Sequence, residues 1–314
     1  MSDEIKKKNP QYKGQEDKSR QDKISDQKPD NQDKNQIELL QKLLIEKESE
    51  IQIYRKELFK ISHQLDEVMS QISTDVDALK KIHKALVPTE IPNMAGFEFS
   101  RKFLYGSKTG GDYFDIFEHE DRLKFGILLS SSSGYAMSAL FLSLVLKVSH
   151  LIEAKKGLSP DKVIEKISTE LKDIASSKDH AHVFYGVVDR RNYTLNLCVV
   201  GQIHGFLQSP TEPLKLISSS SDPLGPQFSP TFKSISVDLE SKARLVLVSD
   251  GITKVLSIDE ISKLLTNQLD KLQVHDVRNE LLYQCQKKTG LENPINDQTV
   301  VVMDVKDRVI KLAK

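Results

Sequence analysis

The chain has 314 residues, in which 45 Lys and Arg residues balance 45 Asp and Glu residues. A net charge of zero excludes a protein whose main partner is a nucleic-acid backbone, because such proteins carry an excess of cations. The two cysteines, Cys198 and Cys285, have no metal-binding spacing and indicate thiols in a reducing compartment. No signal peptide begins the sequence, and the longest apolar stretch, 136–146, is too short to span a membrane. We therefore expect a soluble cytoplasmic protein.

Residues 1–35 form a highly charged segment. They include nine Lys or Arg and eight Asp or Glu residues, and their sizeable apolar side chains are Met1, Ile5, Tyr12 and Ile24. A segment of this composition buries too little apolar surface to offset its conformational entropy. The composition predicts a disordered tail over 1–35, with a weak docking arm as the alternative.

A heptad pattern begins at Ile37. Every seventh residue from Ile37 to Leu86 is apolar, and so are five of the seven residues in the partner series three positions later. Lys47 and Asp75 interrupt that partner series. No proline or glycine breaks the pattern, and a heptad sustained over roughly 75 Å of helix is typical of a left-handed coiled coil. The sequence predicts a coiled-coil helix over 36–87 that forms a parallel homodimer; packing of the helix on its own C-terminal domain is the alternative.

From residue 88 the pattern becomes mixed α and β. Apolar runs typical of strands occupy residues 97–104, 122–129, 182–188, 193–200, 203–207, 243–249 and 299–305. Helical patterns occupy residues 135–154, 159–175, 258–269 and 274–288. Because the strands come in groups and do not alternate with helices, the sequence favours an α+β domain over 88–310 with largely antiparallel sheets. The serine runs 130–133 and 218–221 are predicted to be loops.

Three acidic residues stand at the borders of predicted strands. Asp112 follows two glycines, Asp250 follows the run 245–248, and Asp297 precedes the run 299–302. Each of these short motifs is by itself typical of a turn. Together they indicate a site for a hard cation such as Mg²⁺ or Mn²⁺, because carboxylates gathered from separate strand ends form such sites.

Short motifs occur in a fixed order through residues 85–305. They are Ala85-Leu86-Val87-Pro88, Gly110-Gly111-Asp112-Tyr113-Phe114-Asp115, Ser138-Ala139-Leu140, Val200-Gly201-Gln202, Asp222-Pro223-Leu224-Gly225, Ser249-Asp250-Gly251-Ile252-Thr253 and Asn296-Asp297-Gln298-Thr299. In this order they resemble the PPM-type (protein phosphatase 2C-like) serine phosphatases, and more narrowly their SpoIIE/RsbU-like branch. The resemblance implies an α/β-sandwich of two largely antiparallel sheets flanked by helices, preceded here by the long coiled-coil helix.

The resemblance also implies a role in bacterial signalling. Enzymes of this branch remove phosphate from phosphoserine in proteins of the anti-sigma antagonist kind, with a water activated by two Mn²⁺ or Mg²⁺ ions. Carried over by position, Asp112 would be the carboxylate shared by both ions, and Gly111 would allow the tight turn beside it. Asp250 would hold one of the ions. A phosphoprotein of this kind is therefore the expected partner.

Two ligand positions of the resembled motifs carry neutral residues. Ser130 stands where the family has a metal-binding aspartate, and Asn296 stands where its last motif begins with an acid. Asp115 and Asp297 are partial substitutes at best, because side chains alternate faces along a strand. Each missing carboxylate forfeits several kcal/mol of attraction for a cation, even at an effective dielectric constant of ~20. We therefore expect a degenerate domain with weak or no catalysis that acts as a regulatory or binding module; an active Mn²⁺- or Mg²⁺-dependent phosphoserine phosphatase with relocated ligands is the alternative.

Overall fold

The computed structural model describes residues 31–86, 91–107, 111–133, 142, 145, 157–267 and 269–306. The chain forms two compact units, Met1–Met69 and Ser70–Lys314. The first thirty residues of the predicted charged tail lie outside the described residues. The same holds for Gly110, for the motif Ser138-Ala139-Leu140 and for most of the helix predicted over 135–154.

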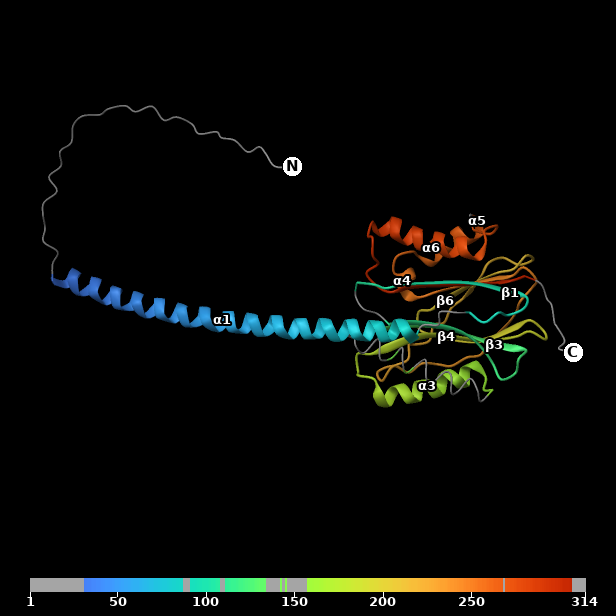
Figure 1. The fold of residues 1–314 in the computed structure, drawn as a ribbon, viewed down its shortest axis with the longest axis horizontal. Helices are drawn as coiled ribbons and strands as arrows, with labels where there is room; N and C mark the ends of the chain where they lie inside the picture. The colour runs from blue at the N-terminus through green and yellow to red at the C-terminus, as the bar shows by residue number, and fades with distance from the viewer. Residues whose placement is uncertain are drawn as a thin grey trace, which may run out of the picture. The chain divides into compact units, whose positions relative to one another are not determined.

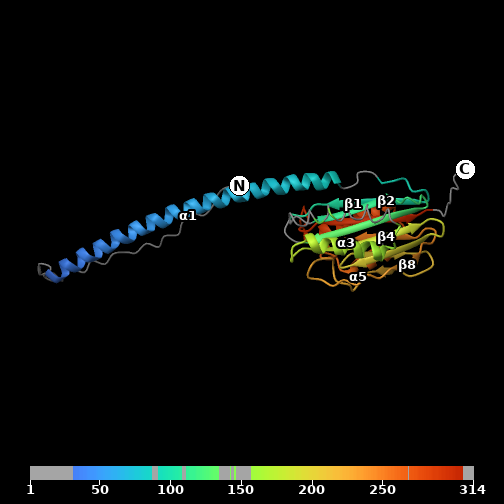
Figure 2. The ribbon, with the colours of Figure 1, turned by 90° about the horizontal axis from the view of Figure 1, so that it is seen from below.

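The N-terminal helix α1, Asn31–Leu86, is one continuous element of 56 residues (Figures 1 and 2). It begins at Asn31 and not at residue 36, so the last residues assigned to the charged tail are helical. The described apolar side chains of its heptad pattern are about half exposed or more, with Leu44 at 61% and Leu58 at 66%. Exposed apolar side chains in a heptad pattern are expected to pack against a second helix. The structure contains one chain, so the coiled-coil pairing stays a prediction. None of the helices in the described part of the chain is long and apolar enough to cross a bilayer.

Two five-stranded antiparallel sheets form the centre of the C-terminal domain. One sheet has the order β1-β10-β9-β6-β7 and the other the order β2-β3-β4-β5-β8. The strands of the first sheet are β1 Phe97–Leu104, β10 Gln298–Val305, β9 Arg244–Val248, β6 His204–Gln208 and β7 Lys215–Ile217. The strands of the second are β2 Gly111–Glu118, β3 Lys124–Ser133, β4 His180–Asp189, β5 Thr194–Val200 and β8 Ile235–Asp238. The predicted α+β class with two antiparallel sheets is confirmed.

Helices cover the outer faces of both sheets, as Figure 1 shows. The helix α3, Pro160–Ile174, packs its apolar side on the second sheet, and Figure 2 views the domain from this side. The helices α5, Ile258–Asn267, and α6, Val274–Thr289, pack on the first sheet. Side chains such as Phe125 and Leu247 fill the space between the two sheets. Burial of these apolar faces stabilises a sandwich of four layers.

The serine run 130–133 is not a loop, and this prediction is wrong. Residues 130–133 are the last part of β3, where they pair with β2 on one side and β4 on the other. Serine has a weak strand preference, but a central strand is held by ladder hydrogen bonds on both sides. The second run, 218–221, lies between β7 and β8 as predicted.

Candidate functional site

Three buried carboxylates come together from distant parts of the chain. Asp112, Asp250 and Asp297 are 1%, 3% and 4% exposed, and we call them the acid cluster. Asp112 is the second residue of β2, whereas Asp250 follows β9 and Asp297 precedes β10. The cluster therefore joins the second sheet to the ends of two central strands of the first sheet. The backbone N–H of Asp112 donates to Asp297 Oδ2 at 3.4 Å.

Asp112 lies in an unfavourable electrostatic position for a negative charge. Its Oδ2 accepts a hydrogen bond from Thr299 Oγ1 at 2.8 Å. Burial raises its pKa well above the ordinary value, and the negative charges of Asp297 and Asp250 raise it further. The hydroxyls of Ser131 and Ser249 act in the opposite direction but do not outweigh these effects. Asp112 therefore favours its protonated form far more than a carboxyl in water does.

Asp250 is paired with groups of the protein on both of its oxygens. Ser131 Oγ donates to Oδ1 at 2.5 Å, and Lys254 Nζ lies 2.5 Å from Oδ2. Burial alone would raise the pKa of Asp250, but the Lys254 ammonium and the Ser131 hydroxyl outweigh it and hold the pKa below the ordinary value. Asp250 is thus ionised at neutral pH.

The helical turn α4, Asp250–Thr253, starts directly against the segment before β10. A Cβ atom added to Gly251 would lie 1.8 Å from the carbonyl oxygen of Asp297. Only glycine allows the two backbones to approach this closely. This contact holds Asp250 and Asp297 side by side.

The serine that faces the acid cluster is Ser131 and not Ser130. The register of β2 and β3 pairs Asp112 with Ser131 and Tyr113 with Ser130. Ser130 Oγ donates to the carbonyl oxygen of Tyr113 at 3.3 Å, away from the acids. The strand predicted over 122–129 ends before both serines, so only the register of β2 and β3 identifies Ser131.

The other predicted site residues, Asp115, Gly111 and Asn296, are not members of the acid cluster. Asp115, three residues after Asp112 on the same strand, accepts a hydrogen bond from the Tyr113 hydroxyl at 2.8 Å and belongs to the other face of the sheet. Gly111 begins β2. Asn296 is half-buried and lines a pocket of about 280 Å³ together with Lys254.

A second, larger pocket borders the acid cluster. Its volume is about 510 Å³, and Asp250 and Lys254 line one part of it. Its other lining residues include His180, His182, Gly201, Gln202 and the serine loop 219–221. Burial lowers the pKa of His182 to about 4, although Asp250 opposes this shift, so the imidazole is neutral at pH 7. Its Nδ1 accepts a hydrogen bond from the backbone N–H of Gln202 at 3.1 Å.

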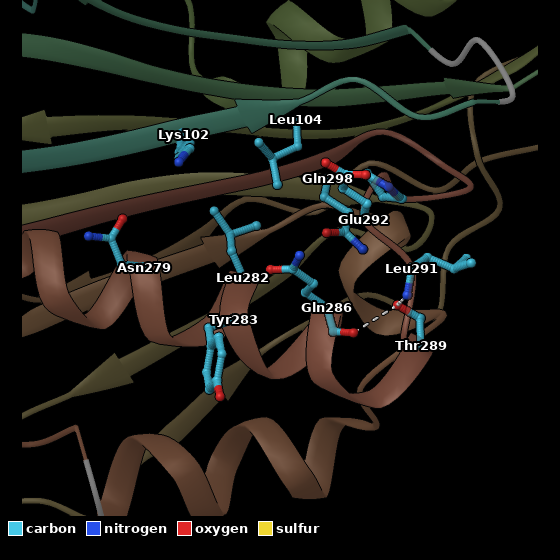
Figure 3. Close-up of a pocket in the computed structure, with 11 residues that line it drawn as sticks. Lys102, Leu104, Asn279, Leu282, Tyr283, Gln286, Thr289, Leu291, Glu292 and Gln298 are labelled. Atoms are coloured by element: carbon cyan, nitrogen blue, oxygen red, sulfur yellow. Dashed lines mark hydrogen bonds between the residues drawn. The ribbon is translucent and has the colours of Figure 1, made fainter. Parts of the chain in front are cut away.

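A third pocket, of about 330 Å³, lies between α6 and β1 (Figure 3). Lys102 and Leu104 of β1 lie on one side of it, with Asn279 and Gln286 of α6 opposite. None of its lining residues belongs to the acid cluster. This third pocket is therefore separate from the acid cluster.

The side chains of the acid cluster do not fit a two-metal centre. Both oxygens of Asp250 already meet donors of the protein, and so do those of Asp297, which accepts the N–H groups of Gly106 at 2.7 Å and of Asp112. Among the described residues, no group of three or more His, Cys, Asp and Glu side chains has the arrangement of a metal site. A pair of divalent cations needs several free carboxylate oxygens to offset the repulsion between them.

A family model described as Stage II sporulation protein E (SpoIIE) matches residues 121–306, more than half of the chain. A comparison with curated proteins finds no match.

Several solved structures share the fold. One contains the PP2C phosphatase domain and a fragment of the regulatory domain of SpoIIE from Bacillus subtilis, with a TM-score of 0.56 and 17% identity over 67% of this chain and 62% of that chain. Another is the SiaA-PP2C domain of Pseudomonas aeruginosa, with a TM-score of 0.65 and 14% identity over 76% and 98%. A third is RsbX in complex with magnesium, with a TM-score of 0.54 and 16% identity over 69% and 99%. This chain thus spans less than two thirds of the Bacillus subtilis structure, and at these identities the likeness concerns the fold alone.

Proposed function

Because this chain belongs to the SpoIIE family of PP2C-type phosphatase domains, which act in bacterial signalling, we propose that it is a degenerate member with weak or no catalysis. It acts instead as a regulatory or binding module. The observation that carries this proposal is the pairing of Asp250, whose oxygens are held by Ser131 and Lys254. A family whose chemistry relies on Mn²⁺ or Mg²⁺ needs these oxygens for the metal.

The charges of the cluster support the same proposal. Lys254 neutralises Asp250, and the raised pKa of Asp112 disfavours its negative charge. The residue that pairs with Asp112 on the neighbouring strand β3 is Ser131, which carries no charge. The net negative charge left to attract divalent cations is therefore small.

The first prediction concerns turnover. We expect the purified protein to release almost no phosphate from a phosphoserine peptide or an aryl phosphate in millimolar Mn²⁺ or Mg²⁺, because its carboxylates are already paired. Phosphate release is measured against a buffer blank and against the Asp112→Asn variant, which should give the same rate as the unmodified protein.

The alternative, an active Mn²⁺- or Mg²⁺-dependent phosphoserine phosphatase, is favoured by one observation. Three carboxylates remain buried together, and Asp250 and Lys254 open into a pocket of about 510 Å³. Robust turnover that Asp112→Asn abolishes would establish this alternative and contradict the proposed function.

The partner is proposed on the same basis. A phosphoprotein of the anti-sigma antagonist kind is the partner expected for a phosphatase-like pocket that binds without hydrolysis.

We further propose that α1 pairs two copies of the chain in a parallel coiled coil. The exposed seam that runs from Ile37 through Leu58 to Ile72 supports this pairing, because water-exposed apolar heptads associate.

The second prediction tests the seam. Leu58→Lys places a charge in the predicted interface and should shift the protein from dimer to monomer at micromolar concentration in light scattering. The matched control is Phe59→Lys, since Phe59 is also apolar and 74% exposed but lies beside the predicted seam. The control should stay dimeric. A monomeric unmodified protein, or equal dissociation by both variants, would contradict the coiled-coil dimer.

A further inference from the structure

We propose that the ammonium group of Lys254 is the resident cation of the acid cluster, so that Asp250 is neutralised without a divalent ion. The inference rests on the proposed function and deepens it, because it names the residue that takes the place of a metal. Lys254 Nζ and Asp250 Oδ2 are 2.5 Å apart.

The backbone fixes Lys254 at this position. It follows Asp250 by four residues at the end of α4, where its φ and ψ angles of −68° and −21° are helical. Its backbone N–H donates to the Asp250 carbonyl oxygen at 2.8 Å. Residues four apart on a helical turn lie on the same face, so the ammonium reaches the carboxylate over a short path.

The burial of its partner distinguishes this ion pair from the lysine pairs described within α1 and α3. The Asp250 side chain is 5% exposed, whereas the carboxylates of the pairs Lys47–Glu50 and Lys162–Glu165 are 42% and 47% exposed. A carboxylate in water needs no counter-ion, but a buried one does. Lys254 therefore supplies the counter-ion that a buried carboxylate needs, whereas the exposed carboxylates of the other two pairs need none.

The Lys254 side chain also blocks the access of a free cation to Asp250. It is 46% exposed and lines both pockets beside the cluster, the one with His182 and the one with Asn296. A divalent ion that approaches Asp250 from either pocket meets a positive charge first. It must displace the ammonium from Oδ2 before it can bind there.

The test compares Mn²⁺ binding by the full chain and two variants. Lys254→Met keeps the length and apolar stem of the side chain but removes the charge, and Lys254→Arg is the matched control that keeps it. We expect Lys254→Met to bind Mn²⁺ about tenfold or more tightly than the unmodified protein in calorimetry. We expect Lys254→Arg to bind as weakly as the unmodified protein.

Thermal unfolding gives a second readout. Without metal, Lys254→Met should unfold at a lower temperature, because it leaves the Asp250 carboxylate buried and unpaired. Added Mn²⁺ should restore much of this loss, and it should leave the unfolding temperature of the unmodified protein unchanged. The double variant Lys254→Met with Asp250→Asn should show no response to Mn²⁺.

Two outcomes would overturn the role of Lys254. One is an unmodified protein whose unfolding temperature is raised by added Mn²⁺, a measurement that needs no variant. The other is a folded Lys254→Met variant with no gain in Mn²⁺ affinity. Both concern metal binding, so they are distinguishable from phosphate release, which tests the proposed function.

Discussion

Replacing Gly251 with alanine is expected to destabilise the C-terminal domain by about 3 kcal/mol or more. The added Cβ would lie 1.8 Å from the carbonyl oxygen and 3.0 Å from the carbonyl carbon of Asp297. Both atoms belong to the backbone, so no side chain can rotate to make room. The start of α4 and the segment before β10 would have to separate, which would disrupt the acid cluster as well.

The control for this variant is Gly290→Ala. Gly290 ends α6 with a φ of +66°, but an added Cβ there meets nothing within 4 Å. Alanine should therefore cost only about 1 kcal/mol, from backbone strain alone. Differential scanning calorimetry of the full chain measures both variants. A loss for Gly251→Ala no larger than that for Gly290→Ala would contradict the close approach of the two backbones.

Replacing Asp112 or Asp250 with asparagine is expected to change the free energy of unfolding in opposite directions. Asp112→Asn should stabilise the protein at neutral pH by about 0.5–2 kcal/mol, because it removes a buried carboxyl whose ionisation is opposed by burial, Asp297 and Asp250 and keeps an oxygen for the Thr299 hydroxyl. Asp250→Asn should destabilise it by about 1–3 kcal/mol, because it breaks the pair with Lys254. The cost is below that of a fully buried pair, since the Lys254 side chain is 46% exposed.

The pH dependence of both effects follows from the pKa shifts. The raised pKa of Asp112 means that the unmodified protein loses stability as the pH rises above the ordinary carboxyl pKa of 3.8. The lowered pKa of Asp250 means that its contribution is present above that value and is lost as the pH falls through the folded pKa.

The Asp112→Asn difference should therefore be small at about pH 4 and grow towards neutral pH, whereas the Asp250→Asn difference should already be present at about pH 4, with the opposite sign. Urea unfolding of the three proteins at about pH 4 and about pH 7 measures them. Equal signs for Asp112→Asn and Asp250→Asn at neutral pH would contradict the assigned charge states.

Local sequence patterns were sufficient for much of the fold. The strand β1 coincides with the predicted run 97–104, and α6 begins at Val274 as predicted. The strand β2 was missed because Gly111, Asp112 and Asp115 are residues typical of turns, whereas pairing with β3 holds them in a strand. The strands β7 and β8, with 3 and 4 residues, are too short to show a periodic pattern.

The candidate site was predictable only in part. The sequence pointed to Asp112, Asp250 and Asp297, and the structure brings them together. It gave no reason to choose Ser131 over Ser130, because that choice depends on the register between β2 and β3. Lys254 was missed although its spacing from Asp250 is that of neighbours on a helix, because the short α4 has no helical pattern of its own.

The strands β1 and β10 pair along all eight residues of each strand, and this pairing affects the order in which the chain folds during synthesis. The first sheet cannot be completed until β10, which the ribosome synthesises after the other strands of the domain, is available. The same stretch supplies Asp297 and Thr299, so the acid cluster is assembled last. The helix α1, whose backbone hydrogen bonds join residues four apart, can form much earlier. The proposed pairing of two chains through α1 could therefore begin while the domain that follows it is still incomplete.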